Sequence, residues 1–153
     1  MAKHYFAVAT VPGIVLMMIV GSLTGCSETP SYDMLPAKGV VQLDGNPIEN
    51  ANVVFHSETG PRAFGTTNAD GEFELNTGDR GAGVATGDFL VKIVSTSETK
   101  TSSGKAVKLS PMYAENGVAV VSVNAGADNS FEFNLKSKPK RGDYLDDNSL
   151  AEP

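Results

Sequence analysis

The sequence predicts an all-β fold, a β-sandwich of two antiparallel sheets with about seven strands. Apolar and polar residues alternate over short runs between residues 36 and 135, the pattern of strands that bury one face. Gly and Pro together make up 24 of the 153 residues, so many positions are suited to turns. No apolar pattern of helical period and adequate length occurs. These observations favour packed sheets over helix bundles or solenoids.

Seven runs carry the alternation in chain order. Side chains on successive strand residues point to opposite faces, so the apolar members of each run are expected to face the core. In the first four runs these residues are Val41 and Leu43; Ala51, Val53 and Phe55; Ala63 in a weak run over 63–67; and Phe73 and Leu75. In the last three they are Phe89, Val91 and Ile93; residues of 118–123; and Phe131, Phe133 and Leu135.

Turn residues separate the runs where hairpins need them. Asp44-Gly45-Asn46-Pro47 follows the first run, Asn68-Ala69-Asp70-Gly71 precedes the fourth, and Gly126-Ala127-Asp128-Asn129 precedes the seventh. Gly, Asn and Asp adopt positive φ readily and Pro fixes φ, so we expect a tight turn at each place. Residues 96–111 are rich in Ser, Thr and Lys and are long for a connection, which predicts a mobile flap.

Several of these patterns occur in an order that is typical of one family. Residues 39–55 form a strand, an Asp-Gly turn and a second strand; residues 67–75 contain Thr-x-x-Asp-Gly-x-Phe; and residues 87–93 begin with Gly-x-Phe-x-Val. They resemble the carboxypeptidase regulatory-like domain, in which Tyr is commoner than Phe at position 89. The resemblance implies a sandwich of transthyretin-like or immunoglobulin-like type. Its motifs specify a fold better than an activity.

The amino-terminal segment has the order of a secretory signal peptide. Lys3 and His4 form a basic start, and residues 6–23 form an apolar stretch. The stretch ends in a motif that resembles the lipobox of bacterial lipoproteins, Leu23-Thr24-Gly25-Cys26. In that family the cysteine thiol receives a diacylglycerol, the signal is cut just before the cysteine, and the new amino terminus is acylated. The resemblance implies removal of residues 1–25 and a fatty acyl anchor, such as palmitate, on Cys26.

Two other interpretations of this segment stay open, an uncleaved membrane anchor and an ordinary signal peptide with an incidental cysteine. A spanning helix needs about 20 apolar residues, whereas Pro12 and Gly13 interrupt this shorter stretch. The one cysteine of the chain stands where the lipobox requires it. We therefore expect a lipid-anchored protein of the bacterial cell envelope. Ser27 follows Cys26, and in lipoproteins of diderm bacteria such a residue, rather than Asp, favours the outer membrane over the inner one.

The chain after the signal divides into three parts. Residues 26–35 are mostly polar, contain Pro30 and are followed by Pro36, which predicts a short tether. Residues 36–135 contain the seven runs and are expected to form the folded domain. Residues 136–153 have few large apolar side chains, which predicts a disordered charged tail. The basic residues of this tail stand at its start: Lys136, Lys138, Lys140 and Arg141.

These four basic residues form a positive cluster on an acidic protein. The net charge is −6, and residues 36–135 contain seven basic and twelve acidic residues. The cluster is suited to attract lipid or polysaccharide phosphates. The alternative is a solvated terminus in which the acidic residues of 143–152 neutralise the basic ones. The overall acidity disfavours nucleic acid as a partner, because phosphate binding needs a basic footprint. The sequence does not indicate an oligomeric state.

Few residues are suited to hold a metal ion. Asn68 and Asp70 place oxygen ligands at alternate positions, as in part of a calcium loop, but the distal acidic ligands of such a loop are missing. A hairpin turn with Asx hydrogen bonds explains the same two residues. His56 is the one histidine after the predicted signal peptide, so a zinc site would lack further His or free Cys ligands. We expect no metal and no cofactor.

Two further patterns have simple structural interpretations. Glu72, Glu74 and Glu132 alternate with apolar residues and are expected to face solvent, although paired carboxylates can perform acid/base chemistry. The tripeptide Arg141-Gly142-Asp143 matches an integrin-recognition sequence. So short a motif arises readily by chance, and a bacterial envelope protein gives it no evident role.

The sequence favours a non-catalytic interaction module over an enzyme. Within the transthyretin-like group, the hydrolase of 5-hydroxyisourate uses His and Arg residues and ends in Tyr-Arg-Gly-Ser, whereas this chain ends in Leu150-Ala151-Glu152-Pro153. The carboxypeptidases linked to the regulatory domain need a His-x-x-Glu zinc motif, which the sequence does not contain. We expect a module that binds an envelope protein or polysaccharide. A passive structural spacer is the alternative.

Overall fold

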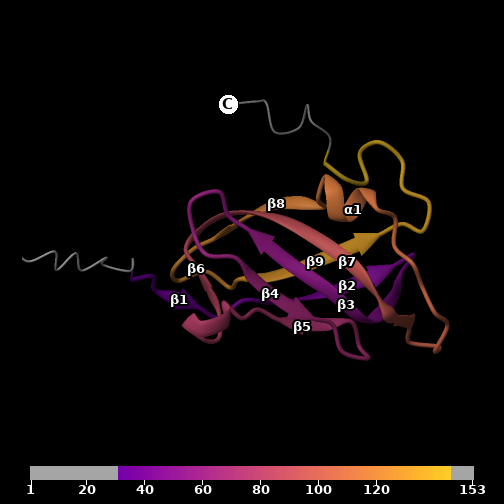
Figure 1. Cartoon of the computed structure of the whole chain (residues 1–153), viewed down its shortest axis with the longest axis horizontal. Coiled ribbons are helices and arrows are strands. Elements are labelled where there is room, and N and C mark those ends of the chain that lie inside the picture. Colours follow the sequence, from indigo (N-terminus) through magenta and orange to yellow (C-terminus); the bar gives the residue numbers. More distant parts are fainter. Residues whose placement is uncertain (1–30, 146–153) are drawn as a thin grey trace, which may run out of the picture. The chain divides into compact units, whose positions relative to one another are not determined.

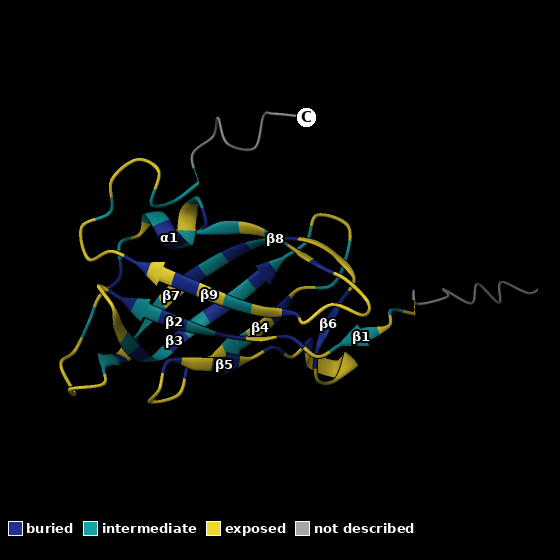
Figure 2. Cartoon of the chain, turned by 180° about the vertical axis from the view of Figure 1, so that it is seen from behind, coloured by how far each residue is buried: buried dark blue, intermediate teal, exposed yellow. Residues whose placement is uncertain are grey.

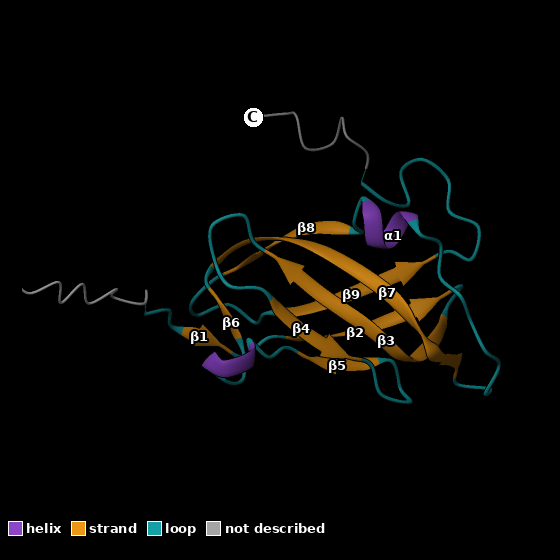
Figure 3. Ribbon diagram, viewed as in Figure 1, coloured by secondary structure: helices purple, strands orange, loops and turns teal. Residues whose placement is uncertain are grey.

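The structure of the chain is a computed structural model that describes residues 31–145 (Figure 1). Strands predominate in this part and its helical segments are short (Figure 3). The elements are β1 (Met34–Leu35), β2 (Lys38–Leu43), β3 (Asn46–His56), β4 (Ala63–Thr66), β5 (Glu72–Glu74), a 3-10 helix (Gly78–Arg80), β6 (Val84–Ala85), β7 (Gly87–Thr101), α1 (Met112–Glu115), β8 (Ala119–Val123) and β9 (Ser130–Leu135). The all-β prediction is confirmed, and the seven predicted runs correspond to β2–β5 and β7–β9.

The strands form two packed layers that β3 joins. In the first layer β2 lies between β5, its antiparallel neighbour, and β9. The second layer has the order β4-β3-β7-β8, and each of its pairs is antiparallel. β3 pairs with the end of β2 through Asn46 and Pro47 and with β7 from Ile48 onward. This long strand therefore passes from one layer to the other, and the arrangement is the predicted β-sandwich.

One strand pair differs from the antiparallel pattern that the sequence predicts. β2 and β9 are parallel, with a continuous register from Lys38 opposite Ser130 to Leu43 opposite Leu135. The two strands come from opposite ends of the domain sequence, so no hairpin connects them and both can run in the same direction. The pair closes the first layer by joining the beginning of the domain to its end.

The core lies between the two layers (Figure 2). The ring of Phe55 on β3 occupies its centre, with its centroid 5.9 Å from that of Phe89, 5.4 Å from that of Phe131 and 6.4 Å from that of Phe133. Rings from both layers therefore meet at one point. Phe131 itself is half-buried. The predicted inward residues that are buried are Val41, Leu43, Ala51, Val53, Phe55, Ala63, Phe73, Leu75, Phe89, Val91, Ile93, Val123, Phe133 and Leu135.

A two-residue turn closes the hairpin of β2 and β3, as the sequence predicts. Asp44 and Gly45 have φ angles of 51° and 80°, and they connect the paired residues Leu43 and Asn46. Positive φ at both central residues is the mark of a type I′ turn, whose twist matches that of the flanking strands. The local sequence thus determines this end of the hairpin.

The predicted mobile flap at residues 96–111 is wrong in its first part. Residues 96–101 belong to β7, which bulges where its register with β3 shifts. The hydroxyl groups of Thr96 and Thr99 donate hydrogen bonds to the carbonyl oxygen of Asn50 at 3.0 and 2.8 Å. A Ser- and Thr-rich sequence normally indicates a loop, but here its hydroxyl groups satisfy the backbone of the neighbouring strand.

The predicted tether at residues 26–35 is also shorter than expected. Met34 and Leu35 form β1, which pairs with Ala85 and Val84 of β6. The apolar side chain of Leu35 packs against the core, and this burial explains why the segment is attached. Upstream, the guanidinium of Arg80 lies over the ring of Tyr32, 5.2 Å from its centroid.

The signal peptide and lipobox predictions concern residues outside the described part of the chain. Residues 1–30, which include Leu23, Thr24, Gly25 and Cys26, are not described. Within residues 31–145 no helix is long and apolar enough to cross a membrane.

Candidate functional site

The residues that follow β9 form an attached loop, and we call residues 136–145 the basic loop. The sequence predicts a disordered tail from residue 136 onward, and the structure describes residues 136–145 of this tail as a loop that makes hydrogen bonds to the sandwich. Hydrogen bonds to the sandwich hold the loop near both of its ends. The tail was expected to be disordered because it has little apolar surface, but its backbone groups find partners on α1 and on the turn between β2 and β3. Residues 146–153 lie outside the described part.

Tyr113 of α1 holds the beginning of the basic loop. Its side chain is fully buried in the core. Its hydroxyl group donates a hydrogen bond to the carbonyl oxygen of Lys136 at 3.0 Å and accepts one from the amide of Lys136 at 2.9 Å. Burial raises the pKa of this hydroxyl above its ordinary value, so it stays protonated and able to donate. One core side chain thus satisfies both backbone groups of the residue that leaves β9.

Asp44, in the turn between β2 and β3, holds the next residue of the loop. Its carboxylate oxygen Oδ1 accepts a hydrogen bond from the amide of Ser137 at 3.2 Å. Hydrogen bonds from Ser137, together with the nearby charge of Lys136, lower the pKa of the Asp44 carboxyl below its ordinary value of 3.8. The type I′ turn therefore also fixes the path of the basic loop.

Protonation of Asp44 is expected to loosen this attachment. The pKa of Asp44 is lowered in the folded state, so its contribution to stability is present above pH 3.8 and is lost as the pH falls through the lower folded value. We expect the protection of the Ser137 amide against hydrogen exchange, followed by NMR, to fall over this acidic range. Asp44→Asn should reduce it at neutral pH as well, since Asn tolerates positive φ but has no charge.

The exposed carboxylate of Glu58 provides the control for this prediction. Glu58→Gln removes one negative charge far along the sequence from Ser137 and should leave the protection of its amide unchanged. An equal loss of protection in both variants would mean that overall charge, rather than the contact to Asp44, holds the loop.

The end of the basic loop is attached beside α1. The amide of Leu145 donates a hydrogen bond to the carbonyl oxygen of Gly117 at 3.0 Å, and the ring of Tyr144 packs against the core. Gly117 has a φ of 92°, and a Cβ at this position would lie 2.6 Å from Cδ1 of Leu90. Both its conformation and its close packing therefore require glycine.

Three exposed cationic side chains stand between the two attachments: Lys138, Lys140 and Arg141. Within residues 31–145 no hydrogen bond or ion pair engages the ammonium groups of Lys138 and Lys140. The amide of Lys140 donates to Oδ2 of Asp143 at 2.8 Å, and the amide of Asp143 donates to the carbonyl oxygen of Lys140 at 3.0 Å. Hydrogen bonds thus hold the backbone between Lys140 and Asp143, the tip of the loop, while the ammonium groups of Lys138 and Lys140 face solvent.

The same turn explains the tripeptide Arg141-Gly142-Asp143. Gly142 has a φ of 100°, and the carboxylate of Asp143 is half-buried and caps the amide of Lys140. The tripeptide is a local turn in which Asp143 already has a backbone partner, and this supports the structural interpretation.

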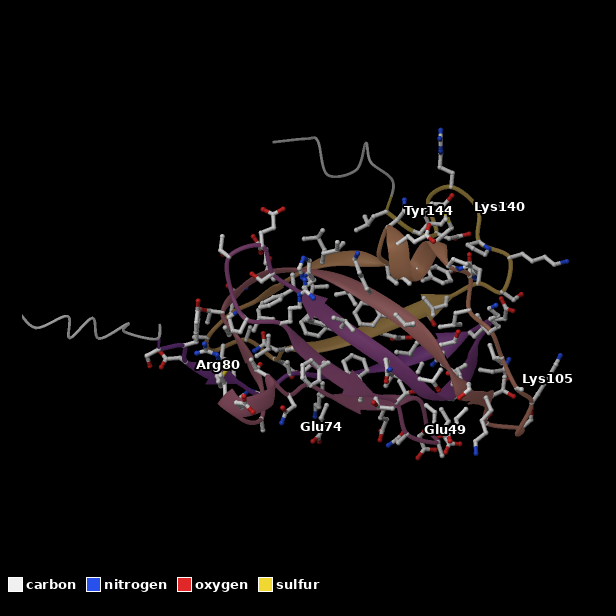
Figure 4. All side chains as sticks on the ribbon, viewed as in Figure 1. Glu49, Glu74, Arg80, Lys105, Lys140 and Tyr144 are labelled. Carbon is white, nitrogen blue, oxygen red and sulfur yellow. The ribbon has the colours of Figure 1, made fainter. Side chains whose placement is uncertain are left out.

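The basic loop and β1 lie at opposite ends of the sandwich (Figures 1 and 4). β1 leads into β2 at Lys38, whereas the basic loop follows β9, the parallel neighbour of β2, after Leu135. A six-residue strand spans about 20 Å, and this length separates the two points. Figure 4 shows Arg80, whose guanidinium lies over Tyr32, at one end of the molecule and Lys140 at the other.

The candidate calcium ligands Asn68 and Asp70 lie in the turn that precedes β5. Oδ1 of Asn68 accepts hydrogen bonds from the amides of Asp70 and Glu72 at 3.0 and 2.9 Å. This is the Asx turn that the sequence suggested as the alternative to a calcium loop. Within residues 31–145 no group of three or more His, Cys, Asp or Glu side chains is placed to hold a metal ion.

The other candidate residues are separated on the strands. His56 ends β3 and is half-buried. Glu72 and Glu74 on β5 and Glu132 on β9 are exposed, so the predicted solvated face is confirmed. Register places Glu72 and Glu132 on opposite sides of Val40, so β2 separates these two carboxylates.

A groove of about 610 Å³ lies at the β1 end of the sandwich. Its lining includes Leu35 and Ala37 together with the charged side chains of Lys38, Glu74 and Asp128. No His, Cys or Ser is among these lining residues. The lining of the groove thus combines apolar and charged side chains.

Sequence reasoning identified the cations of the basic loop but missed the residues that position them. Nothing in the local sequence pattern pairs Tyr113 with Lys136. A large aromatic residue with a polar tip, isolated after a loop, is the signal that could have indicated such an anchor. The sequence predicts Asp44 only as a turn residue.

Comparisons with known proteins do not assign the chain to a family. No family model matches the sequence, and no similar curated protein is found. The resemblance of residues 39–55, 67–75 and 87–93 to the carboxypeptidase regulatory-like domain therefore stays a prediction.

Proposed function

We propose that the protein is a membrane-anchored lipoprotein of the bacterial cell envelope whose β-sandwich is a non-catalytic interaction module. The observation that carries this proposal is the position of Cys26. It ends the lipobox-like motif Leu23-Thr24-Gly25-Cys26 and stands eight residues before β1. A fully extended chain of this length reaches less than about 30 Å. Acylation at Cys26 would therefore hold the β1 end of the sandwich close to the bilayer, and Ser27 favours the outer membrane.

The arrangement of the strands supports a sandwich of the carboxypeptidase regulatory-like kind. The segments that carry the resemblance become the hairpin of β2 and β3, the turn before β5, and the first half of β7. These elements supply most of the core and leave loops and outer faces for contacts. Since Glu72, Glu132 and His56 do not converge, binding rather than catalysis is the function that the geometry supports.

Replacing Cys26 by Ser tests the anchor. Because the thiol of Cys26 is the proposed site of lipid attachment, Cys26→Ser should abolish incorporation of labelled palmitate in the producing bacterium. The variant should also keep its signal segment, which a shift in electrophoretic mobility or mass would reveal. Ser27→Ala is the matched control, because it changes the next residue, keeps the thiol and should be labelled normally. Equal labelling of Cys26→Ser and the unmodified protein would exclude this lipoprotein assignment.

A further inference from the structure

We propose that the basic loop binds an anionic envelope polysaccharide that lies beyond the sandwich as seen from the anchoring bilayer. The loop orientation in this proposal rests on the proposed lipid anchor at Cys26. The loop itself is defined by contacts in the described part of the chain. It presents Lys138, Lys140 and Arg141 from an ordered backbone at the end of the sandwich opposite β1.

The attachments of the loop prepare it for binding. Tyr113 and Asp44 hold its beginning, and Gly117 holds its end. A free tail would lose backbone freedom on meeting a ligand, whereas this backbone is already ordered. The ammonium groups of Lys138 and Lys140 have no partner within residues 31–145, so no internal ion pair must break before they meet an anion.

The chemistry of the tip favours a polymer with repeated charge. Hot spots of protein–protein contacts are enriched in Trp, Tyr and Arg, and they lie in well-packed pockets that exclude water. The exposed part of the loop instead offers two lysines and one arginine at the surface, with Pro139 between the lysines and no aromatic side chain beside them. Extended nucleic acid fits poorly, since residues 36–135 contain twelve acidic and seven basic residues and would repel a long polyanion that lies along the sandwich. A flexible polysaccharide with phosphate or carboxylate groups can contact the tip of the basic loop without lying along the acidic sandwich.

The position of the loop argues against the anchoring bilayer as its ligand. β1 pairs with β6 at the end of the sandwich opposite the basic loop, so the proposed anchor at Cys26 would hold the β1 end near the lipid. The strand length of about 20 Å separates the basic loop from the β1 end. This distance exceeds the Debye length of about 8 Å at physiological salt, so the charges of that bilayer are largely screened at the loop.

Binding to model polyanions tests the proposal. The full chain is purified from the producing cells in mild detergent and placed in neutral phosphatidylcholine vesicles. Co-sedimentation then measures binding of labelled polygalacturonate and, separately, of polyphosphate. Lys138→Gln combined with Lys140→Gln should weaken binding by on the order of 25-fold, about fivefold for each lysine near an anionic surface. Raising the salt from 50 to 300 mM should weaken binding of the unmodified protein as well.

A matched double variant distinguishes the loop from overall charge. Lys38→Gln combined with Arg62→Gln removes two exposed positive charges from β2 and from the segment before β4. This variant should bind both polymers nearly as well as the unmodified protein. Absence of polymer binding, an equal loss in both double variants, or stronger binding to phosphatidylglycerol vesicles than to either polymer would overturn the proposal. Palmitate labelling of Cys26 is read separately, so failure of the anchor is recognised independently of polymer binding.

Discussion

Phe133→Ala is expected to lower the free energy of unfolding by about 3–5 kcal/mol. Phe133 lies on β9, where its buried ring is 6.4 Å from the ring of Phe55 and 6.1 Å from that of Phe73. Truncation removes contacts with both layers and leaves a cavity between rings that cannot easily move together. Urea unfolding of the chain lacking residues 1–26, followed by circular dichroism, measures the change. The spectrum of the unmodified protein should show β structure with little helix.

The neighbouring residue Glu132 is the control for Phe133. It lies on the same strand but its side chain is exposed on the opposite face. Glu132→Ala should change the free energy of unfolding by about 0.5 kcal/mol or less. Similar losses in the two variants would mean that the inward and outward faces of β9 are assigned incorrectly.

Tyr113→Ala is expected to have an effect of similar size, about 3–5 kcal/mol. The substitution empties a fully buried site in the core and leaves the amide and carbonyl groups of Lys136 without their hydroxyl partner. Urea unfolding gives the loss of stability. Hydrogen exchange at Lys136 should increase more than exchange at the centre of β3, because the basic loop loses its first attachment.

Tyr113→Phe separates the hydroxyl from the ring. This variant keeps the aromatic packing and should cost about 1 kcal/mol, the net contribution of a typical hydrogen bond, because water can reach the exposed residue Lys136. The control is Tyr144→Phe, since the Tyr144 hydroxyl makes no hydrogen bond within residues 31–145. It should change stability by about 0.5 kcal/mol or less. If Tyr113→Phe were as stable as the unmodified protein, the two hydrogen bonds to Lys136 would not hold the loop.

Sequence alone predicted the features that depend on near neighbours in the chain. Alternation identified the buried residues Val53 and Phe133 because a strand places every second side chain on one face. The turn at Asp44 and Gly45 could also be predicted, because few residue types adopt positive φ at two consecutive positions. These local rules were sufficient for the fold class and for most of the core.

Features that depend on distant partners could not be predicted in this way. The parallel pairing of β2 with β9 joins residues more than ninety positions apart, and alternation does not indicate which strands pair. The local sequence around Thr96 and Thr99 indicates a loop. Only the structure shows that their hydroxyl groups donate hydrogen bonds to the carbonyl oxygen of Asn50. For the candidate site, the cations at Lys138 and Lys140 were visible in the sequence. Their ordering was not, because it comes from single hydrogen bonds to Tyr113 and Asp44.

The parallel register of β2 and β9 also determines how the domain would carry mechanical tension. A pull between the two proposed attachments, the anchor before β1 and the polymer at the basic loop, would act on Lys38 and Leu135, at opposite ends of two neighbouring strands. Such a force runs along the strands and loads the hydrogen bonds of the whole register at once, instead of opening them one by one from an end. The sandwich would therefore behave as a stiff link between its two ends.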